Sequence, residues 1–313
     1  MTLALDPLAD AVVAPPLAPP PDDDSEGFAA LLAQVEREHG FLVRSYKERC
    51  LRRRVAVRMR ATGTHTYDQY ARALAADGRE YERLLDALTI NVTRLFRDRD
   101  AWAALDTHVL GPLVDGGGPV RAWSAGCASG EEPYSLAALL HARLDARLHA
   151  RAERAGDGVS LGGPAVGIPA GARVLGTDVD RASLDAAAGG AYPESAFAEV
   201  PPEVRARYFR VLPGRAAPGD AVARVAPELR ALAGFARHDL LRDPVPEGPW
   251  QLIACRNVVI YFDRASQEAL FERFHAALEP GGVLFLGKVE TLLGPIRALF
   301  APVDARQRLF RRL

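Results

Sequence analysis

From residue 120 onward the sequence alternates short apolar runs with stretches of helical periodicity. This alternation is typical of a parallel sheet joined by crossover helices, because buried parallel strands are continuously apolar while the covering helices are amphipathic. We therefore expect an α/β domain over residues 120–313. Residues 150–172 are rich in Gly, Ala and Pro, which predicts a flexible surface insertion. The predicted strands are residues 120–125, 173–177, 250–254 and 283–287.

The N-terminal part of the chain follows a different pattern. Residues 1–25 are rich in proline and end in acidic residues, and we expect a disordered tail because such a segment buries too little apolar surface to fold. Residues 26–90 show four helical periods separated by glycines, which predicts a small all-helical domain. Its second helix is expected from about Tyr46 to Arg60. Residues 91–119 follow as a linker and a further helix.

Bulk composition argues against several classes of protein. A formal net charge of −1 does not suit a chain that coats nucleic acid, so any charge-based recognition must come from a local patch. Three cysteines without a C-x-x-C pair indicate neither a disulfide framework nor a metal site. The sequence has no apolar run long enough to span a membrane and no basic region of a signal peptide. We therefore expect a cytoplasmic protein that is not embedded in a membrane.

The strongest local motif follows the first predicted strand and leads into a helix. It is Gly126-Cys-Ala-Ser-Gly-Glu-Glu-Pro-Tyr134. Glycines let the backbone approach a ligand closely, and a helix N-terminus presents free N–H groups. The carboxylates of Glu131 and Glu132 do not suit a phosphate, but they suit a ligand with a cationic amino group such as S-adenosylmethionine. A glycine turn that closes tightly without any ligand is the alternative.

A second motif, Val174-Leu-Gly-Thr-Asp178, ends the next predicted strand. An acid at the end of the second strand of a βαβ unit is placed to bind both hydroxyls of a ribose, and Asp178 is the candidate. Asp180 is expected to cap the following helix, and capping alone is the alternative role for an acid at such a place. The spacing from Gly130 exceeds the roughly 20 residues usual for a dinucleotide site. The predicted insertion accounts for the excess.

Two further segments carry polar groups that could reach the same ligand. Within residues 251–263, an apolar strand ends in Arg256 and Asn257, and an aromatic pair follows. Ligands of open α/β sheets bind at the carboxyl ends of strands, although these two residues could equally hold down a loop. Residues 88–98 place polar side chains at alternate positions between the two domains, and taken alone they could be a simple linker.

In order and spacing, these segments together resemble the chemotaxis receptor methyltransferases of the CheR type, which are protein-glutamate O-methyltransferases. The most specific pieces are Gly126-Cys-Ala-Ser-Gly-Glu-Glu-Pro-Tyr-Ser135 and Cys255-Arg-Asn-Val-Val-Ile-Tyr-Phe-Asp263. The resemblance implies an N-terminal all-helical domain followed by a Rossmann-like S-adenosylmethionine-dependent methyltransferase domain. It also implies a small inserted β-subdomain at about residues 192–235. In some members that subdomain docks a receptor's C-terminal peptide, which this sequence leaves open.

The resemblance further implies S-adenosylmethionine as cofactor and S-adenosylhomocysteine as product. Either Glu131 or Glu132 would bind the methionine amino group, and Asp178 would hold the ribose. Asp239 is a departure, because the family commonly has Asn before the following Leu. The residues assigned to the cofactor in this way are Asn91, Thr93, Arg97, Gly126, Glu131, Glu132, Asp178, Asp239, Leu240, Asn257 and Val258.

The implied reaction needs little acid–base chemistry. A glutamate side chain is ionised at neutral pH, so its carboxylate can accept a methyl group without a general base. We expect catalysis mainly from alignment of the reacting atoms in a site that excludes water. Arg97 is expected to orient the carboxylate and Tyr261 to shape the methyl end.

Arginines crowd the second predicted helix, among them Arg49, Arg52, Arg53 and Arg58. We expect them to steer the acidic helical methylation region of a chemoreceptor to the protein. A solvated arginine-rich face is the alternative, and nucleic acid is a less suitable partner. The rival functions are a receptor-binding signalling module that only retains the cofactor pocket and a methyltransferase of small molecules. The intact glycine turn argues against the first, and the basic helix against the second.

Overall fold

The computed structural model describes residues 24–39, 42–88, 93–155, 171–214, 217 and 219–313. This described chain divides into two compact units. The helical unit consists of residues 24–39 and Arg49–Ala87, and the sheet unit consists of Leu42–Glu48 and Leu88–Leu313. The predicted tail, apart from its last two residues, and residues 156–170 of the predicted insertion lie outside the described residues.

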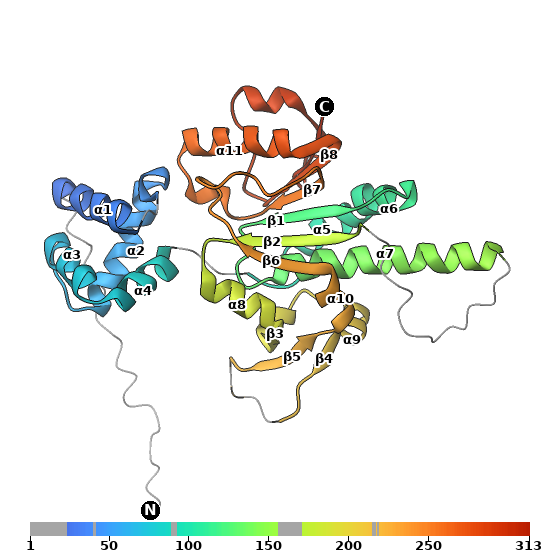
Figure 1. Ribbon diagram of the computed structural model, residues 1–313, viewed down its shortest axis with the longest axis horizontal. Coiled ribbons are helices and arrows are strands. Elements are labelled where there is room, and N and C mark those ends of the chain that lie inside the picture. The colour runs from blue at the N-terminus through green and yellow to red at the C-terminus, as the bar shows by residue number, and fades with distance from the viewer. Residues whose placement is uncertain (1–23, 40–41, 89–92, 156–170, 215–216, 218) are drawn as a thin grey trace, which may run out of the picture. The chain divides into compact units, whose positions relative to one another are not determined.

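The helical unit contains four helices (Figure 1), and aromatic side chains are among its buried residues. The rings of Phe28 and Tyr67 pack with their centroids 5.1 Å apart, and both side chains are buried. Thr66 caps the third helix by accepting a hydrogen bond from the N–H of Gln69 at 3.2 Å. The predicted all-helical N-terminal domain is confirmed. Its helices are α1 (Ser25–His39), α2 (Glu48–Ala61), α3 (Tyr67–Ala76) and α4 (Gly78–Leu88).

The sheet unit is built on a seven-stranded sheet with the order β6-β2-β1-β7-β8-β10-β9. The first five strands in this order are parallel, and β10 and β9 are antiparallel to their neighbours. Three short strands that were not predicted complete the sheet. Strand β6 forms one edge, and β10 and β9 lie at the other. The bounds are β1 (Arg121–Ala125), β2 (Arg173–Asp178), β6 (Ala233–Arg237), β7 (Trp250–Cys255), β8 (Leu278–Leu286), β9 (Phe300–Asp304) and β10 (Leu309–Arg312).

Side chains of the central strands alternate between two cores on opposite faces of the sheet, as the period of two in a strand requires. In β7, Leu252 and Ala254 belong to one core, whereas Ile253 and Cys255 belong to the other. Helix α11 covers the face of the second core, and α5 and α7 cover the first (Figure 1). The predicted Rossmann-like architecture is confirmed.

The helices of the sheet unit are connected closely to its strands. A π-helical turn, Asp106–Leu110, joins α5 to α6. None of the helices within the described ranges has the length and apolarity needed to cross a bilayer. The main helices are α5 (Arg99–Leu105), α6 (Gly111–Gly116), α7 (Glu131–Ala155), α8 (Arg181–Gly189) and α11 (Arg264–Ala277).

A separate three-stranded antiparallel sheet of order β3-β5-β4 lies where the small β-subdomain was expected. Its elements are β3 (Ala191–Pro193), α9 (Pro202–Tyr208), β4 (Phe209–Val211), β5 (Ala221–Val225) and α10 (Pro227–Leu232). These elements end within three residues of the expected boundary at about residue 235. Helix α10 returns the chain to the main sheet, where β6 pairs with β2 from residue 233 onward. Residues 150–155, which were expected in the insertion, are instead the last turns of α7.

One segment expected in the helical domain belongs instead to the sheet unit. The second helix begins at Glu48, two residues after its expected start, and is preceded by a 3-10 turn, Val43–Ser45, and by Tyr46 in an extended conformation. Tyr46 forms an isolated antiparallel bridge with Phe262. The N–H of Lys47 donates to the carbonyl of Tyr261, and the N–H of Asp263 donates to the carbonyl of Ser45, both at 2.8 Å. These backbone bonds hold residues 42–48 against the loop that follows β7.

Candidate functional site

The turn between β1 and α7 is bound to the end of β2. The N–H of Gly126 donates to the carbonyl of Thr177 at 2.8 Å. Gly126 has a φ of +81°, and a Cβ there would lie 2.6 Å from Cγ2 of Val258. Gly130 has a φ of +90°, and its Cβ would lie 2.7 Å from Cβ of Ala187. Both positions therefore require glycine, Gly126 for its approach to the loop after β7 and Gly130 for packing on α8.

Asp178 ends β2 with its carboxylate directed at this turn. Its Oδ2 accepts from the N–H of Ala128 at 2.9 Å, and its Oδ1 accepts from the N–H of Asp180 at 3.0 Å. The residue is only 8% exposed, and burial raises its pKa although these N–H groups oppose the shift. A carboxylate offers about four acceptor positions, so both oxygens retain capacity for further donors. Asp180 itself caps α8 through the N–H of Ala182 at 2.9 Å, as predicted.

The two glutamates at the start of α7 have different surroundings. Glu131 accepts from Oγ of Ser129 at 2.8 Å and is buried. Glu132 accepts from Oγ of Ser124 at 2.8 Å and lies 3.7 Å from Nη1 of Arg256. Burial raises the pKa of both carboxyls, and the Arg256 cation opposes that rise at Glu132. Glu132 is thus held beside a cation, whereas Glu131 bonds back to its own turn.

Asn257 follows β7 in a left-handed conformation, with a φ of +60°. The carboxylate of Glu290 holds this turn: Oε2 accepts from the N–H of Asn257 at 2.9 Å and from that of Gly287 at 2.7 Å. Its Oε1 accepts from the N–H of Ile260 at 3.3 Å. Glu290 is 4% exposed, and burial raises its pKa against the effect of these N–H groups. A buried carboxylate therefore fixes the backbone that presents Asn257.

Arg256 joins three segments of the site. Its Nη2 donates to the carbonyl of Arg97 at 2.9 Å and to Oδ2 of Asp98 at 3.0 Å. The guanidinium lies 4.6 Å from the ring centroid of Phe285, and burial lowers the pKa of Arg256 while Glu132 raises it. One of the two roles considered for Arg256 was to hold down a loop, and these contacts agree with that role. Arg256 holds the backbone at Arg97 and lies beside Glu132.

Two neighbouring cavities lie at the carboxyl ends of the parallel strands, where ligands of open α/β sheets bind. They form one cleft because they share Gly126, Ala128, Asn257, Val258 and Tyr261. The first cavity is also lined by Tyr46, Leu88, Asp178, Val179, His238, Asp239, Leu240 and Phe262. The second is also lined by Thr93, Arg94, Arg97, Trp102, Cys127, Glu132 and Arg256.

Most residues predicted to bind the cofactor line this cleft. Asp178, Asp239 and Leu240 contribute to the first cavity, and Thr93, Arg97 and Glu132 to the second. The shared wall holds the predicted Gly126, Asn257, Val258 and Tyr261. Glu131 is not part of either lining, and Asn91 lies outside the described residues.

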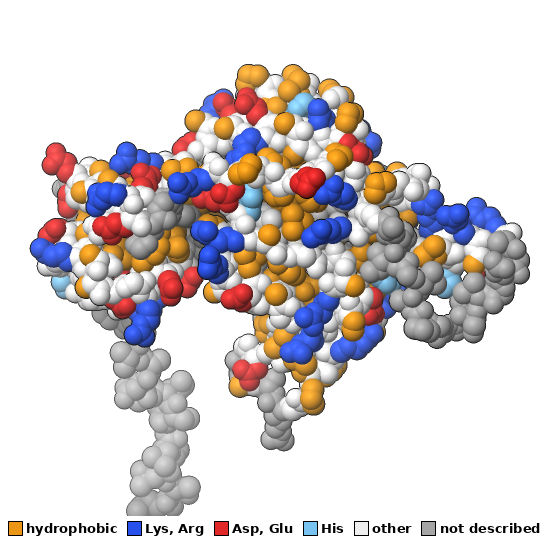
Figure 2. Space-filling view, viewed as in Figure 1, with side chains coloured by type: hydrophobic (Ala, Val, Ile, Leu, Met, Phe, Trp, Pro, Cys, Tyr) orange, Lys and Arg blue, Asp and Glu red, His pale blue; other side chains and the backbone are white. Residues whose placement is uncertain are grey.

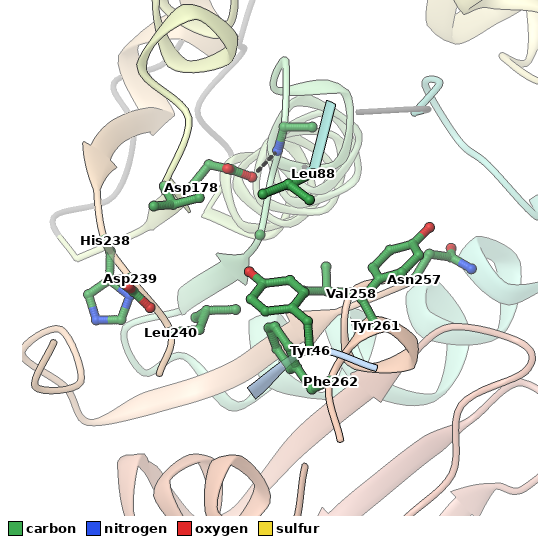
Figure 3. Close-up of a pocket in the computed structure, with 13 residues that line it drawn as sticks. Tyr46, Leu88, Asp178, His238, Asp239, Leu240, Asn257, Val258, Tyr261 and Phe262 are labelled. Carbon is green, nitrogen blue, oxygen red and sulfur yellow. Dashed lines mark hydrogen bonds between the residues drawn. The ribbon is translucent and has the colours of Figure 1, made fainter. Parts of the chain in front are cut away.

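Figure 3 shows how the first cavity is arranged. The Tyr46 ring lies between Leu240 and Val258, with Phe262 beneath it, and Asp178 bonds to the backbone of the glycine turn on the other side. Asp239, the departure from the family pattern, accepts from the N–H of Leu241 at 2.9 Å through Oδ1. Its carboxylate is therefore already engaged in a local turn at the edge of the cavity.

Sequence reasoning missed several lining residues. Tyr46 gave no signal, because it was assigned to a helix in the other domain. His238 is buried beside Asp239, and its ring faces Trp123 with centroids 5.6 Å apart. Phe262 follows Tyr261 in the aromatic pair after Asn257, and no role was predicted for it. Glu290 was also missed, because its function depends on N–H groups that only the folded loop brings together.

The arginines of α2, predicted to bind substrate, do not form one exposed set. Arg49 and Arg53 are exposed. The Arg52 guanidinium lies 4.2 Å from the centroid of the Phe28 ring, so it packs on the core of its own unit. Nε and Nη2 of Arg58 donate to Glu80 at 2.9 and 2.7 Å, and the Arg58 side chain is 18% exposed. We therefore correct the expectation for Arg58, whose guanidinium is paired with a buried acid.

Lys and Arg side chains also gather over the end of the sheet unit that carries α9 and β4 (Figure 2). The arginines of this region are paired with acids rather than unopposed, which limits its net charge. The ion pairs are Arg205–Glu194 at 2.6 Å, Arg207–Asp145 at 2.6 Å and Arg210–Glu228 at 3.4 Å.

Comparison with known proteins matches nearly the whole chain to one family. Residues 26–89 match the all-alpha domain of CheR methyltransferases, and residues 91–154 and 166–308 match their SAM binding domain. A chemotaxis protein methyltransferase of Listeria monocytogenes is 32% identical over 83% of this chain and 88% of its own length. One from Salmonella typhimurium is 30% identical over 86% of this chain and 85% of its own.

A longer relative is also similar. An uncharacterised 104.1 kDa protein of Rhodobacter capsulatus is 35% identical over 86% of this chain, which spans only 26% of that protein. Among solved structures, the N-methyltransferase NodS from Bradyrhizobium japonicum matches at 15% identity with a TM-score of 0.31 over 62% of each chain, too weakly to support a conclusion. The two domain matches, the methyltransferases at about a third identity and the cleft lined by the predicted residues establish that this chain belongs to the CheR methyltransferase family.

Proposed function

We propose that this protein transfers the methyl group of S-adenosylmethionine to glutamate carboxylates of bacterial chemoreceptors, forming glutamyl methyl esters in chemosensory adaptation. The observation that carries the proposal is the two-part cleft, with Asp178 in one cavity and Glu132 and Arg97 in the other. Ligands of open α/β sheets bind at this place, outside the carboxyl ends of the strands. The names of the Listeria and Salmonella relatives support the link to chemotaxis.

The residues of the cleft fit S-adenosylmethionine from end to end. Asp178 has acceptor capacity for two ribose hydroxyls, and the first cavity offers apolar and aromatic walls to a base. Glu132 supplies an anion for the methionine amino group, with Arg256 beside it to favour its ionised form. Gly126 leaves room between the two parts that a Cβ would fill.

In this arrangement the reacting end would lie in the second cavity, which Thr93, Arg97 and Tyr261 line. When bound, the cofactor supplies a methyl group on a sulfonium, whose transfer to an ionised carboxylate requires no proton transfer. Arg97 can orient the substrate carboxylate by a charge-assisted hydrogen bond. Its own backbone is held by Arg256 and by Nε1 of Trp102, which donates to the Arg97 carbonyl at 2.8 Å. Catalysis then depends mainly on alignment.

The direct test is methyl transfer to receptor. The full-length protein is incubated with methyl-labelled S-adenosylmethionine and membranes that contain chemoreceptors, and labelled protein is treated with mild base. We expect base-labile label on receptors, as methyl esters require, and about 30-fold less with the Glu132→Gln variant at limiting cofactor. Binding of S-adenosylhomocysteine without any transfer to receptor would contradict the proposal and favour a binding module instead.

Receptor docking is assigned to the exposed arginines of α2. Arg49 and Arg53 are the members of the predicted set that remain open to a partner, and the acidic methylation region of a receptor is complementary to them. Reversing both to Glu should raise the Michaelis constant for receptor about tenfold at low salt and weaken its salt dependence. The turnover number should change little, since neither residue lines the cleft.

A matched double reversal on the sheet unit controls for net charge. Arg297 and Arg306 are exposed and lie outside the linings of both cavities. Their replacement by Glu should leave the Michaelis constant for receptor within about twofold. Equal effects of the two double variants would show that only overall charge matters and would remove α2 from docking.

A receptor C-terminal peptide is the second docking element that we propose. Strand β4 is an edge of the small sheet, and Val211 on it is 82% exposed. An open strand edge can take an added peptide strand. Removing the C-terminal residues of the receptor should then raise its Michaelis constant for the wild-type enzyme. An identical value for the intact and shortened receptors would exclude docking at this edge.

A further inference from the structure

The first cavity contains an aromatic residue from outside the SAM binding domain. Residues 26–89 match the all-alpha domain, and the match to the SAM binding domain begins at residue 91. Tyr46 lies within the first of these ranges, yet it lines the first cavity together with Asp178, Asp239 and Leu240. The segments that match the SAM binding domain therefore do not include every residue that lines the first cavity.

The Tyr46 ring is held in place from two sides. Its centroid lies 5.0 Å from that of Phe262, with the planes at 82°, an edge-to-face contact. The bridge to Phe262 and the backbone bonds of Ser45 and Lys47 to the loop after β7 fix the segment on either side. That loop also presents Val258, which lies beside the Tyr46 ring in the wall of the cavity (Figure 3). The ring is thus a preorganised wall.

The surroundings of the phenol indicate which part of the ligand it faces. The ring lines the first cavity only, at the side of the cleft away from Thr93, Arg97 and Glu132. Burial raises the pKa of Tyr46, and the carboxylates of Asp239 and Asp178 raise it further, so the hydroxyl stays protonated near two acids. A neutral aromatic group beside the acid assigned to the ribose suits a nucleoside.

We propose that Tyr46 is a cofactor-binding residue whose ring packs on the nucleoside of S-adenosylmethionine and sets the affinity for that half of the molecule. This inference rests on the proposed cofactor and names a contact at the same site. In this proposal, one residue of the range that matches the all-alpha domain binds the cofactor. Cofactor binding is then not confined to the range that matches the SAM binding domain.

The test measures two ligands by calorimetry with the full-length protein. S-adenosylhomocysteine contains both halves of the cofactor, whereas methylthioadenosine lacks the amino acid half. Tyr46→Ala should weaken both ligands by the same factor, about 10- to 100-fold, because both lose the aromatic contact. Tyr46→Phe keeps the ring and should stay within about fivefold of wild type. At saturating cofactor, the turnover number of Tyr46→Ala should fall by less than about threefold, since the methyl end lies in the other cavity.

Glu132→Gln is the matched comparison, because it should weaken S-adenosylhomocysteine and leave methylthioadenosine unchanged. A general disturbance of the fold would weaken both ligands in every variant, and urea unfolding of each variant measures it separately. If Tyr46→Ala does not fold, Tyr46→Leu keeps apolar bulk without the planar ring and should still weaken both ligands. Wild-type affinity in the alanine or leucine variant would overturn the role of Tyr46 alone. Failure of the wild type to bind either ligand would instead overturn the proposed function.

Discussion

Replacing Glu132 with glutamine should weaken S-adenosylhomocysteine about 30-fold, whereas the same change at Glu131 should alter it by less than about threefold. Both residues begin α7, and their positions in the motif do not distinguish them. The structure separates them, since Glu132 lines the second cavity beside Arg256 and Glu131 accepts from Oγ of Ser129.

The magnitude follows from the bond that the variant loses. A hydrogen bond to a charged group contributes about 1.5–3 kcal/mol. Glutamine keeps the shape of Glu132 and an acceptor oxygen for Ser124, but it loses the charge that faces a ligand ammonium. A loss of about 2 kcal/mol corresponds to about a 30-fold rise in the dissociation constant. Glu131 is absent from both cavity linings, so its charge has no such partner there.

The pH dependence provides an independent check. Burial raises the pKa of Glu132, so wild-type affinity should fall on acidification at a higher pH than an ordinary glutamate would give. Glu132→Gln has no such group and should show a flatter profile in that range. The assay is isothermal titration with S-adenosylhomocysteine across the acidic range. Equal losses in the two variants, or a full-strength Glu132→Gln complex, would refute the assignment.

Four further changes test other parts of the structure. Glu290→Gln should lower the free energy of unfolding by about 1–3 kcal/mol in urea, because an amide cannot accept all the N–H groups now bonded to the carboxylate. An unchanged value would mean that the loop does not depend on it. Arg58→Leu should cost the helical unit about 3–5 kcal/mol by leaving Glu80 buried without its cation, and wild-type stability would contradict the buried pair. Arg97→Ala should reduce turnover about 100-fold in the methyl-transfer assay while cofactor affinity stays within about tenfold, and intact turnover would remove Arg97 from the reaction. Because burial raises the folded-state pKa of Glu131, Glu131→Gln should raise the free energy of unfolding near neutral pH and have less effect in acid; a pH-independent difference would argue against this.

The central sheet was predictable because its inner strands are buried on both faces. Residues 120–125, 173–177 and 250–254 read as apolar runs and agree closely with β1, β2 and β7. By contrast, β6 is an edge strand whose residues are partly or fully exposed, so it shows no apolar run and was placed in the β-subdomain. Pairing with β2 determines its place in the sheet.

The same difference applies to the site: some of its residues can be predicted from the local sequence, and others depend on contacts between distant segments. The positions of Asp178 and Asn257 could be predicted because each lies at the carboxyl end of a recognisable strand, where the ends of parallel strands converge. Tyr46 could not, since its contact with Phe262 joins segments that are distant in sequence. Arg58 looked like its exposed neighbours because composition does not reveal that Glu80 pairs with it.

A crystal structure of the full-length protein with S-adenosylhomocysteine would test most directly how the cleft binds the cofactor. We expect the ribose hydroxyls on Asp178, the base against Tyr46, and the amino group on Glu132. The sulfur should then face the part of the cleft lined by Arg97 and Tyr261. A ligand in the reverse orientation, with its amino acid end at Asp178, or one bound outside these two cavities, would contradict the proposed site.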